Sequence, residues 1–128
     1  MTTVLVCDDS PLARETLRRA VAAVPGVDRV TVAGSGEEVL SRWAGERPDL
    51  VLMDIQLPHM DGTEALHRLR DSPETRKVPV VALTAFAMRE DREQALRAGF
   101  DGYIEKPISV RELPGQIRHF LDGKEPSR

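Results

Sequence analysis

The feature that most constrains the fold is a set of three uninterrupted apolar runs, each of which ends on a polar residue. The runs cover residues 4–7, 50–53 and 80–83. Apolar runs of this length are typical of strands buried on both faces, as in a parallel sheet covered by helices. Asp8, Asp54 and Thr84 follow them directly, so these side chains are expected at the carboxyl edge of the sheet, where open α/β sheets bind ligands. Taken alone, an aspartate there is also explained as a turn residue.

Helix signals separate the predicted strands. Residues 10–11 (Ser-Pro) are typical of a helix start, and the apolar spacing after them predicts a helix that runs to about Val24. The pattern Ser-x-x-Glu at residues 35–38 and 109–112 predicts two further starts. Residues 114–115 (Pro-Gly) fall inside the last of these helices and either kink it or delay its start. Two shorter helical patterns cover residues 63–69 and 90–97.

Two more strands complete an α/β pattern. Residues 29–33 alternate polar and apolar side chains, which predicts a strand with one wet face at an edge of the sheet, and residues 102–105 form a short fifth strand. Regular alternation of strands and helices predicts a doubly wound parallel sheet. The edge position of the second strand favours the flavodoxin-like (βα)5 order 2-1-3-4-5 over the Rossmann order. We expect one domain over residues 1–122 and a disordered tail over residues 123–128.

Composition excludes several classes of protein. A chain of 128 residues with 41% hydrophobic content suits one domain with a single core. The net charge of -3 and the lack of a basic tract disfavour nucleic-acid binding. The sequence shows no signal-peptide pattern and no apolar run of membrane-spanning length, and its one cysteine, Cys7, cannot form an internal disulfide. These observations predict a cytoplasmic protein without a membrane partner.

Charged and polar side chains gather where the predicted strands end. The first strand ends in Asp8 and Asp9, the third in Asp54, the fourth in Thr84 and the fifth in Lys106. Because the carboxyl ends of parallel strands share one edge, these side chains are expected to converge. Three carboxylates that lie close together repel one another unless a cation is present, and hard oxygen ligands favour Mg²⁺. Lys106 would add a further compensating charge.

These strand ends resemble the receiver domain of two-component response regulators, and the resemblance covers nearly the whole chain. The matching motifs are Val-Cys-Asp-Asp-Ser at 6–10, Leu-Met-Asp-Ile-Gln-Leu-Pro at 52–58, Met-Asp-Gly at 60–62, Ala-Leu-Thr-Ala at 82–85 and Tyr-Ile-Glu-Lys-Pro at 103–107. The sequence around Thr84 and Lys106 is most similar to receivers of hybrid sensor kinases. It also resembles single-domain regulators of the cell-cycle type.

The resemblance implies a phosphorylation site with a metal ion. Asp54 would be the nucleophile that takes a phosphoryl group from a phosphohistidine. Asp8, Asp9 and Asp54 would hold Mg²⁺, with Asp8 acting through water. The backbone carbonyl of Gln56 would be a further metal ligand.

The resemblance also assigns the residues that respond to phosphorylation. Lys106 would pair with Asp54 and then with the phosphoryl oxygens, and the Lys106-Pro107 peptide bond is expected to be cis. Thr84 would bond the phosphoryl group, and Tyr103 would turn inward behind it. Phe86 occupies a position that in the family helps or hinders an attacking water, and its ring predicts slow self-dephosphorylation.

The function predicted in this way is that of a phospho-accepting signalling domain, which is not an enzyme although it assists its own phosphorylation and dephosphorylation. A sensor histidine kinase or a histidine phosphotransfer protein would donate the phosphoryl group. The face of the fourth helix, fifth strand and last helix would then control a partner protein. We expect a monomer or weak dimer. Arg14, Arg18 and Arg19 are interpreted as a solvated face of the first helix, on which the donor could also dock.

Alternatives within and outside this class stay open at the level of sequence. The chain could be a phosphorelay intermediate, a phosphate sink or a receiver excised from a hybrid histidine kinase. A haloacid-dehalogenase-like phosphatase also uses a strand-end aspartate and Mg²⁺, but usually has an acid where this chain has Gln56. A flavodoxin needs a phosphate-binding loop where this chain has Asp8 and Asp9, whose charges would repel a phosphate.

Overall fold

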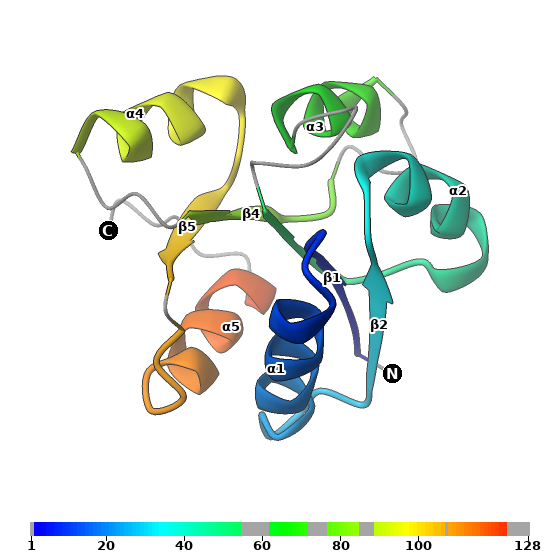
Figure 1. Cartoon of the computed structure of the whole chain (residues 1–128), viewed down its shortest axis with the longest axis vertical. Coiled ribbons are helices and arrows are strands. Elements are labelled where there is room, and N and C mark those ends of the chain that lie inside the picture. Colours follow the sequence, from blue (N-terminus) through cyan, green and yellow to red (C-terminus); the bar gives the residue numbers. More distant parts are fainter. Residues whose placement is uncertain (1, 55–61, 72–76, 85–88, 107, 123–128) are drawn as a thin grey trace.

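The computed structural model shows strands and helices in strict alternation (Figure 1). It describes residues 2–54, 62–71, 77–84, 89–106 and 108–122. The strands are β1 (Thr3–Cys7), β2 (Arg29–Ala33), β3 (Leu50–Asp54), β4 (Val80–Thr84) and β5 (Gly102–Glu105). The helices are α1 (Pro11–Ala22), α2 (Gly36–Glu46), α3 (Gly62–Arg70), α4 (Arg89–Ala98) and α5 (Leu113–Leu121). The predicted tail, residues 123–128, lies outside the described residues.

The sheet has the flavodoxin-like order that the sequence predicts. Its strands run in the order β2-β1-β3-β4-β5, and every neighbouring pair is parallel. Every residue of β1, β3 and β4 is buried, whereas β2 at the edge alternates between buried and more exposed positions. The uninterrupted apolar runs therefore correspond to strands covered on both faces.

Two apolar clusters, one on each face of the sheet, form the core. Side chains of α1 and α5, among them Leu17 and Ile117, pack on one face. Side chains of α2 and α3, among them Trp43 and Leu66, pack on the other, together with Met53 of β3. Successive strand residues point to opposite faces, so the strands supply both clusters. Trp43 and Met53 thus belong to the core. No helix in the described part of the chain combines the length and apolar character that a membrane crossing requires.

Helix α1 begins as predicted but ends earlier. The Ser10 side chain accepts a hydrogen bond from the Ala13 amide, and proline follows at the first helical position. The helix ends at Ala22 rather than near Val24. Val24 precedes Pro25, and a residue before proline is disfavoured in helical conformation. Val24 is nevertheless buried in the α1 cluster, as its spacing suggested.

Helix α5 begins later than its predicted start at Ser109. The Ser109 hydroxyl does accept a hydrogen bond from the Glu112 amide, at 3.3 Å, but this bond closes a separate turn before the helix. The helix itself starts at Leu113, with Pro114 in its first turn. Proline fits there because the first amides of a helix have no carbonyl partner within it. The delayed start, rather than a kink, is therefore the correct alternative.

Candidate functional site

The parallel sheet brings the predicted site residues to one edge. Asp8 follows β1 and Asp54 ends β3, and both residues are at least nine-tenths buried. Thr84 ends β4 and is 3% exposed. Lys106 follows β5, and its backbone amide donates to the Thr84 carbonyl oxygen at 2.8 Å. Four strand ends thus position one lysine, one threonine and two carboxylates.

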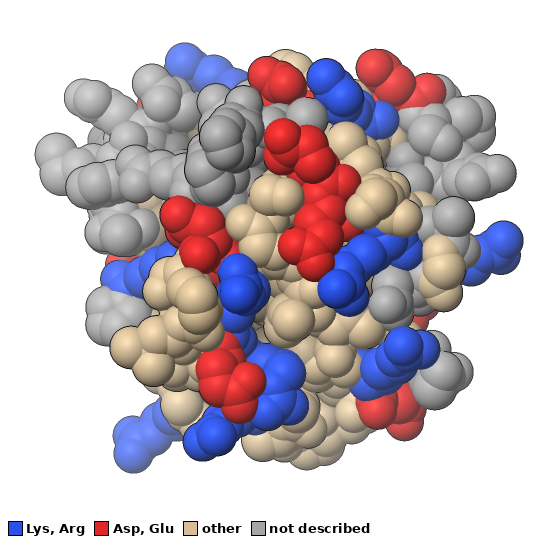
Figure 2. Space-filling view, turned by 45° about the vertical axis from the view of Figure 1, so that its right-hand side comes forward, with Lys and Arg blue, Asp and Glu red and all other residues tan. Residues whose placement is uncertain are grey.

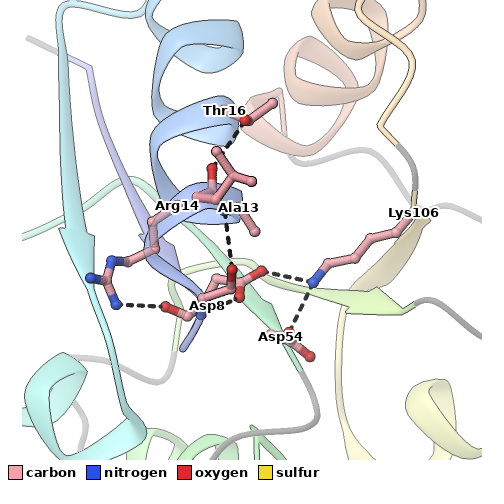
Figure 3. Close-up of polar contacts among 8 residues, drawn as sticks. Asp8, Ala13, Arg14, Thr16, Asp54 and Lys106 are labelled. Carbon is pink, nitrogen blue, oxygen red and sulfur yellow. Dashed lines mark hydrogen bonds and ion pairs between the residues drawn. The ribbon is translucent and has the colours of Figure 1, made fainter.

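Lys106 contacts two carboxylates at once. Its Nζ lies 2.7 Å from Asp8 Oδ2 and 2.9 Å from Asp54 Oδ2, so one ammonium bridges the ends of β1 and β3 (Figure 3). Burial lowers the pKa of Lys106, but hydrogen bonds to Asp8 and Asp54 and the charges of both carboxylates outweigh it and raise the pKa above its ordinary value. The lysine therefore stays protonated at neutral pH.

Cys7 lies directly before Asp8 and is fully buried. Burial, and then the charges of Asp54 and Asp8, raise the pKa of its thiol to about 12. A thiol in this state is a poor nucleophile and a poor metal ligand, because both roles need the thiolate. The sulfur therefore takes no part in the chemistry of the site and fills space in the core.

The carboxylates form an oxygen cluster of a size that suits one small cation. One oxygen from each of Asp8, Asp9 and Asp54 lies within 4.8 Å of the others. Mg²⁺ takes oxygen ligands from carboxylates and from water, so a cluster of this size could hold one ion through direct and water-mediated contacts. Figure 2 shows a continuous group of acidic side chains near the centre of the upper part of its face, with basic side chains beside it and further, separate acidic side chains around it. The donor set, three carboxylates, fits Mg²⁺.

The backbone around Asp8 is anchored on several sides. The Asp8 amide donates to the Ala33 carbonyl at 3.1 Å, and Asp8 Oδ1 accepts from the Ser10 amide at 3.0 Å. The Asp8 carbonyl accepts from Arg14 Nη1 at 3.1 Å. Backbone and side chain of Asp8 therefore have little freedom, as a ligand of a small ion requires.

Arg14 differs from the solvated face predicted for the first helix. Arg18 and Arg19 both pair with Glu15, at 2.6 and 2.8 Å, and they lie as a solvated face would. Arg14 instead is half-buried and reaches the Asp8 backbone. The interpretation as a solvated face was wrong for Arg14. The useful signal in the sequence was its position one turn after the Ser10 cap, which keeps it near the end of β1.

The structure describes only some of the remaining residues that the sequence predicts to be functional. Tyr103 lies half-buried on β5, opposite Ala82 of β4, and packs against the cluster on the α2 and α3 side. Three residues to which the sequence gave roles lie outside the described residues, namely Gln56, Phe86 and Pro107. The structure thus brings together Asp8, Asp9, Asp54 and Lys106, with Thr84 at the same edge.

Comparison with known proteins gives one consistent result. The sequence matches the family model of the response regulator receiver domain over residues 4–118. A protein of Brucella anthropi described as the polar-differentiation response regulator DivK is 39% identical over 118 residues, which cover 92% of this chain and 94% of the relative.

Solved structures agree with this match. A response regulator from Chloroflexus aurantiacus superposes with a TM-score of 0.87 at 30% identity, and the match covers 94% of this chain and 98% of that one. The receiver domain of a sensor histidine kinase from Pseudomonas aeruginosa superposes with a TM-score of 0.84, with the same identity and coverage. That crystal structure has a magnesium ion coordinated in the active-site cleft.

Proposed function

The chain belongs to the family of response regulator receiver domains, and on this premise we propose that it is the phospho-accepting component of a two-component phosphorelay. The observation that carries the proposal is the contact of Lys106 with both Asp8 and Asp54 at the carboxyl edge of the sheet. This arrangement holds a nucleophile, an acidic cluster and a cation together. It supports Asp54 as the residue that is phosphorylated.

The proposed reaction is a transfer between two side chains. An oxygen of the Asp54 carboxylate attacks the phosphorus of a phosphohistidine on a sensor kinase or phosphotransfer protein. A phosphorus–oxygen bond forms, the phosphorus–nitrogen bond breaks, and the leaving imidazole nitrogen keeps the electron pair. Phosphoryl transfer depends chiefly on in-line positioning and on positive charge near the transferred oxygens. Lys106 supplies such a charge within reach of Asp54.

The acidic cluster supports a role for Mg²⁺ in this reaction. When bound, Mg²⁺ would add positive charge beside the transferred oxygens. Asp8, Asp9, Asp54 and the Gln56 carbonyl would hold it, with Asp8 acting through water. Lys106 would leave Asp54 for the phosphoryl oxygens once these are present.

Switching would begin at Thr84 and Tyr103. Thr84 would donate its hydroxyl to the phosphoryl group, which offers three strong acceptors, and Tyr103 would turn inward into the space left behind. The output face would be formed by α4, β5 and α5. A cavity of about 320 Å³ supports the part of this face that β5 and the start of α5 form; its lining residues are Tyr103, Ile104, Glu105, Ser109, Glu112 and Gln116. A partner seated there would contact the residue that is expected to move.

In the cell, the chain would act on another protein rather than on a small substrate. Roles as an adaptor, as a relay intermediate and as a phosphate sink all use the same chemistry at Asp54. The location in the cytoplasm and the state as monomer or weak dimer stay predictions.

The proposal can be tested by intact-mass measurement after incubation with acetyl phosphate, with and without MgCl₂. Wild type should gain one phosphoryl group in the presence of Mg²⁺ and none in its absence. Asp54→Ala should gain none in either case. Equal uptake by wild type and Asp54→Ala would contradict the assignment of the nucleophile.

A further inference from the structure

We propose that Arg14 is a positioning residue for the metal ligands, and that Gly34 provides the space it needs. Arg14 would hold the peptide bond between Asp8 and Asp9 in the orientation that points both carboxylates at one ion. The inference rests on the proposed function, because it takes these two carboxylates as Mg²⁺ ligands.

The argument begins with the peptide unit that joins the two acids. The Asp8 carbonyl and the Asp9 amide belong to one rigid plane, so a bond to that carbonyl fixes the direction in which the chain continues to Asp9. Arg14 Nη1 makes this bond at 3.1 Å. Asp9 is exposed, so it lacks the close packing that holds Asp8 and Asp54. Its placement therefore depends on the backbone.

Arg14 and Lys106 approach Asp8 from opposite sides (Figure 3). Lys106 holds the side-chain oxygen of Asp8 at 2.7 Å, whereas Arg14 holds the main-chain oxygen. The guanidinium thus contacts the metal-binding loop without occupying a carboxylate oxygen, and it leaves the acidic groups available to a cation. A residue that acts in this way orients ligands rather than neutralising them.

Gly34 provides the second, independent part of the argument. A Cβ atom at this position would lie 2.7 Å from Arg14 Nη1 and 3.6 Å from Arg14 Cζ. The Gly34 amide donates to Glu38 Oε1 at 2.9 Å, which keeps the backbone of this loop close to α2. A side chain at residue 34 would therefore occupy the place of the guanidinium. Gly34 does not have a positive φ, so alanine can adopt its backbone conformation.

Arg14 could act as a positioning residue or only as a nearby positive charge. The two roles predict opposite effects of its removal on Mg²⁺ affinity. If Arg14 acted only as a cation near the site, its removal would relieve repulsion and tighten the binding of Mg²⁺. If it positions the ligands, its removal weakens binding. Gly34→Ala separates these effects further, because it displaces the guanidinium while the arginine and its charge stay in the protein.

The experiment is a titration of ¹⁵N-labelled full-length protein with MgCl₂, followed by amide chemical shifts. Arg14→Ala and Gly34→Ala should each raise the dissociation constant about tenfold, the lower end of the usual effect of losing an outer-shell partner. The double variant should bind no more weakly than Arg14→Ala alone, since both changes break one contact. Arg19→Ala is the matched control, because it removes a charge of the same helix that pairs with Glu15, and should change the constant less than twofold.

Folding of each variant is checked by thermal unfolding, and Gly34→Ala keeps the test available if Arg14→Ala does not fold. Mg²⁺ affinity that is unchanged or tighter in folded Arg14→Ala or Gly34→Ala would overturn the inference while the proposed function stood. Absence of Mg²⁺-dependent shifts near Asp8 and Asp54 in wild type would instead overturn the proposed metal site, and the inference with it.

Discussion

The ammonium group of Lys106 places one positive charge between two buried carboxylates, and much of the local charge balance depends on it. Its Nζ contacts Asp8 and Asp54 within 2.9 Å, in a place where water is scarce. Buried acids without a partner destabilise the folded state, because their charges lose hydration without compensation. Loss of the cation from among the acids should therefore destabilise the folded state unless a metal ion takes its place.

Removal of this cation should show how far a metal can replace it. Lys106→Met should lower the free energy of unfolding by about 1–3 kcal/mol in metal-free buffer, since both carboxylates lose a charged hydrogen bond. MgCl₂ should recover more stability in Lys106→Met than in wild type, because the ion takes over the neutralisation. Urea unfolding with and without MgCl₂ checks both statements. A variant more stable than wild type without Mg²⁺ would show that acid repulsion is unimportant here.

Cys7 should make stability fall at alkaline pH. Its folded pKa of about 12 lies above the ordinary value of 9.0, so the folded state favours the neutral thiol. The contribution to stability is fully present below pH 9 and is lost as the pH rises toward 12, because the unfolded thiol ionises first. Between pH 9 and pH 11 this loss amounts to about 2 kcal/mol, because the unfolded thiol is already half ionised at pH 9. The raised pKa of Lys106 acts in the same direction, at still higher pH.

The measurement is urea unfolding of wild type and Cys7→Ala at several pH values between 8 and 11. The slope of stability against pH should be smaller in Cys7→Ala, whatever the packing change costs at neutral pH. Equal slopes in the two proteins would mean that other groups cause the alkaline loss.

At the scale of elements, α5 packs on the edge strand through a residue that has no side chain. A Cβ atom on Gly102 of β5 would lie 2.4 Å from two ring carbons of Phe120 in α5. The Phe120 side chain is buried in the cluster that α1 and α5 share, so the ring has few alternative positions. The position of α5 against β5 therefore depends on the absence of a side chain at Gly102. One side of the proposed output face depends on it as well.

Substitution of Gly102 should therefore loosen the contact between α5 and β5. Gly102→Ala should lower the free energy of unfolding by about 1–3 kcal/mol, as overpacking of a core does. Gly115→Ala in α5 is the matched control, because no atom lies within 4 Å of its Cβ position and alanine favours a helix, so it should raise stability by about 1 kcal/mol. Thermal unfolding compares the two variants. Equal, small effects would show that the ring moves aside at no cost.

Elements were predictable from the sequence wherever one local pattern determined them. The apolar runs located β1, β3 and β4, and through their last residues they located Asp8, Asp54 and Thr84. The end of α1 before Val24 and the start of α5 at Leu113 depended on proline sterics that compete with apolar periodicity and capping. The Ser10 cap indicated only that Arg14 lies near the end of β1. The contact of Arg14 with the Asp8 carbonyl was not predictable, because it crosses from a helix to a strand end through space that Gly34 leaves open.

At the scale of the whole molecule, the two edges of the sheet have different kinds of contact. The carboxyl edge holds the acids and Lys106. At the amino ends of β4 and β5, Arg70 donates to the Val78 carbonyl at 2.9 Å and pairs with Asp101 at 2.6 Å, and Asp101 accepts from the Val80 amide at 2.8 Å. These contacts connect α3 to the amino ends of β4 and β5, and the charges of Arg70 and Asp101 pair with each other. Stability and metal binding should therefore be separable.

Arg70→Ala tests this separation. It should lower the free energy of unfolding by about 1–3 kcal/mol, because Asp101 loses its charged partner and the Val78 carbonyl loses a donor. The dissociation constant for Mg²⁺ should stay within twofold of wild type, since the acids lie at the opposite edge. Unfolding by urea and titration with MgCl₂ give the two quantities. A large loss of Mg²⁺ affinity in the folded variant would show that the edges are coupled.

The bridge from Lys106 to Asp8 joins residues that are 98 positions apart in the chain. During synthesis on the ribosome, Asp8 therefore emerges well before the lysine that contacts it, which follows 98 residues later. A nascent chain that lacks β5 has its acids but not their counter-charge. If Asp54 is the phosphorylated residue, as proposed, its site would be complete only after β5 and Lys106 have joined the sheet, so that phosphorylation would pass over a nascent chain that lacks them.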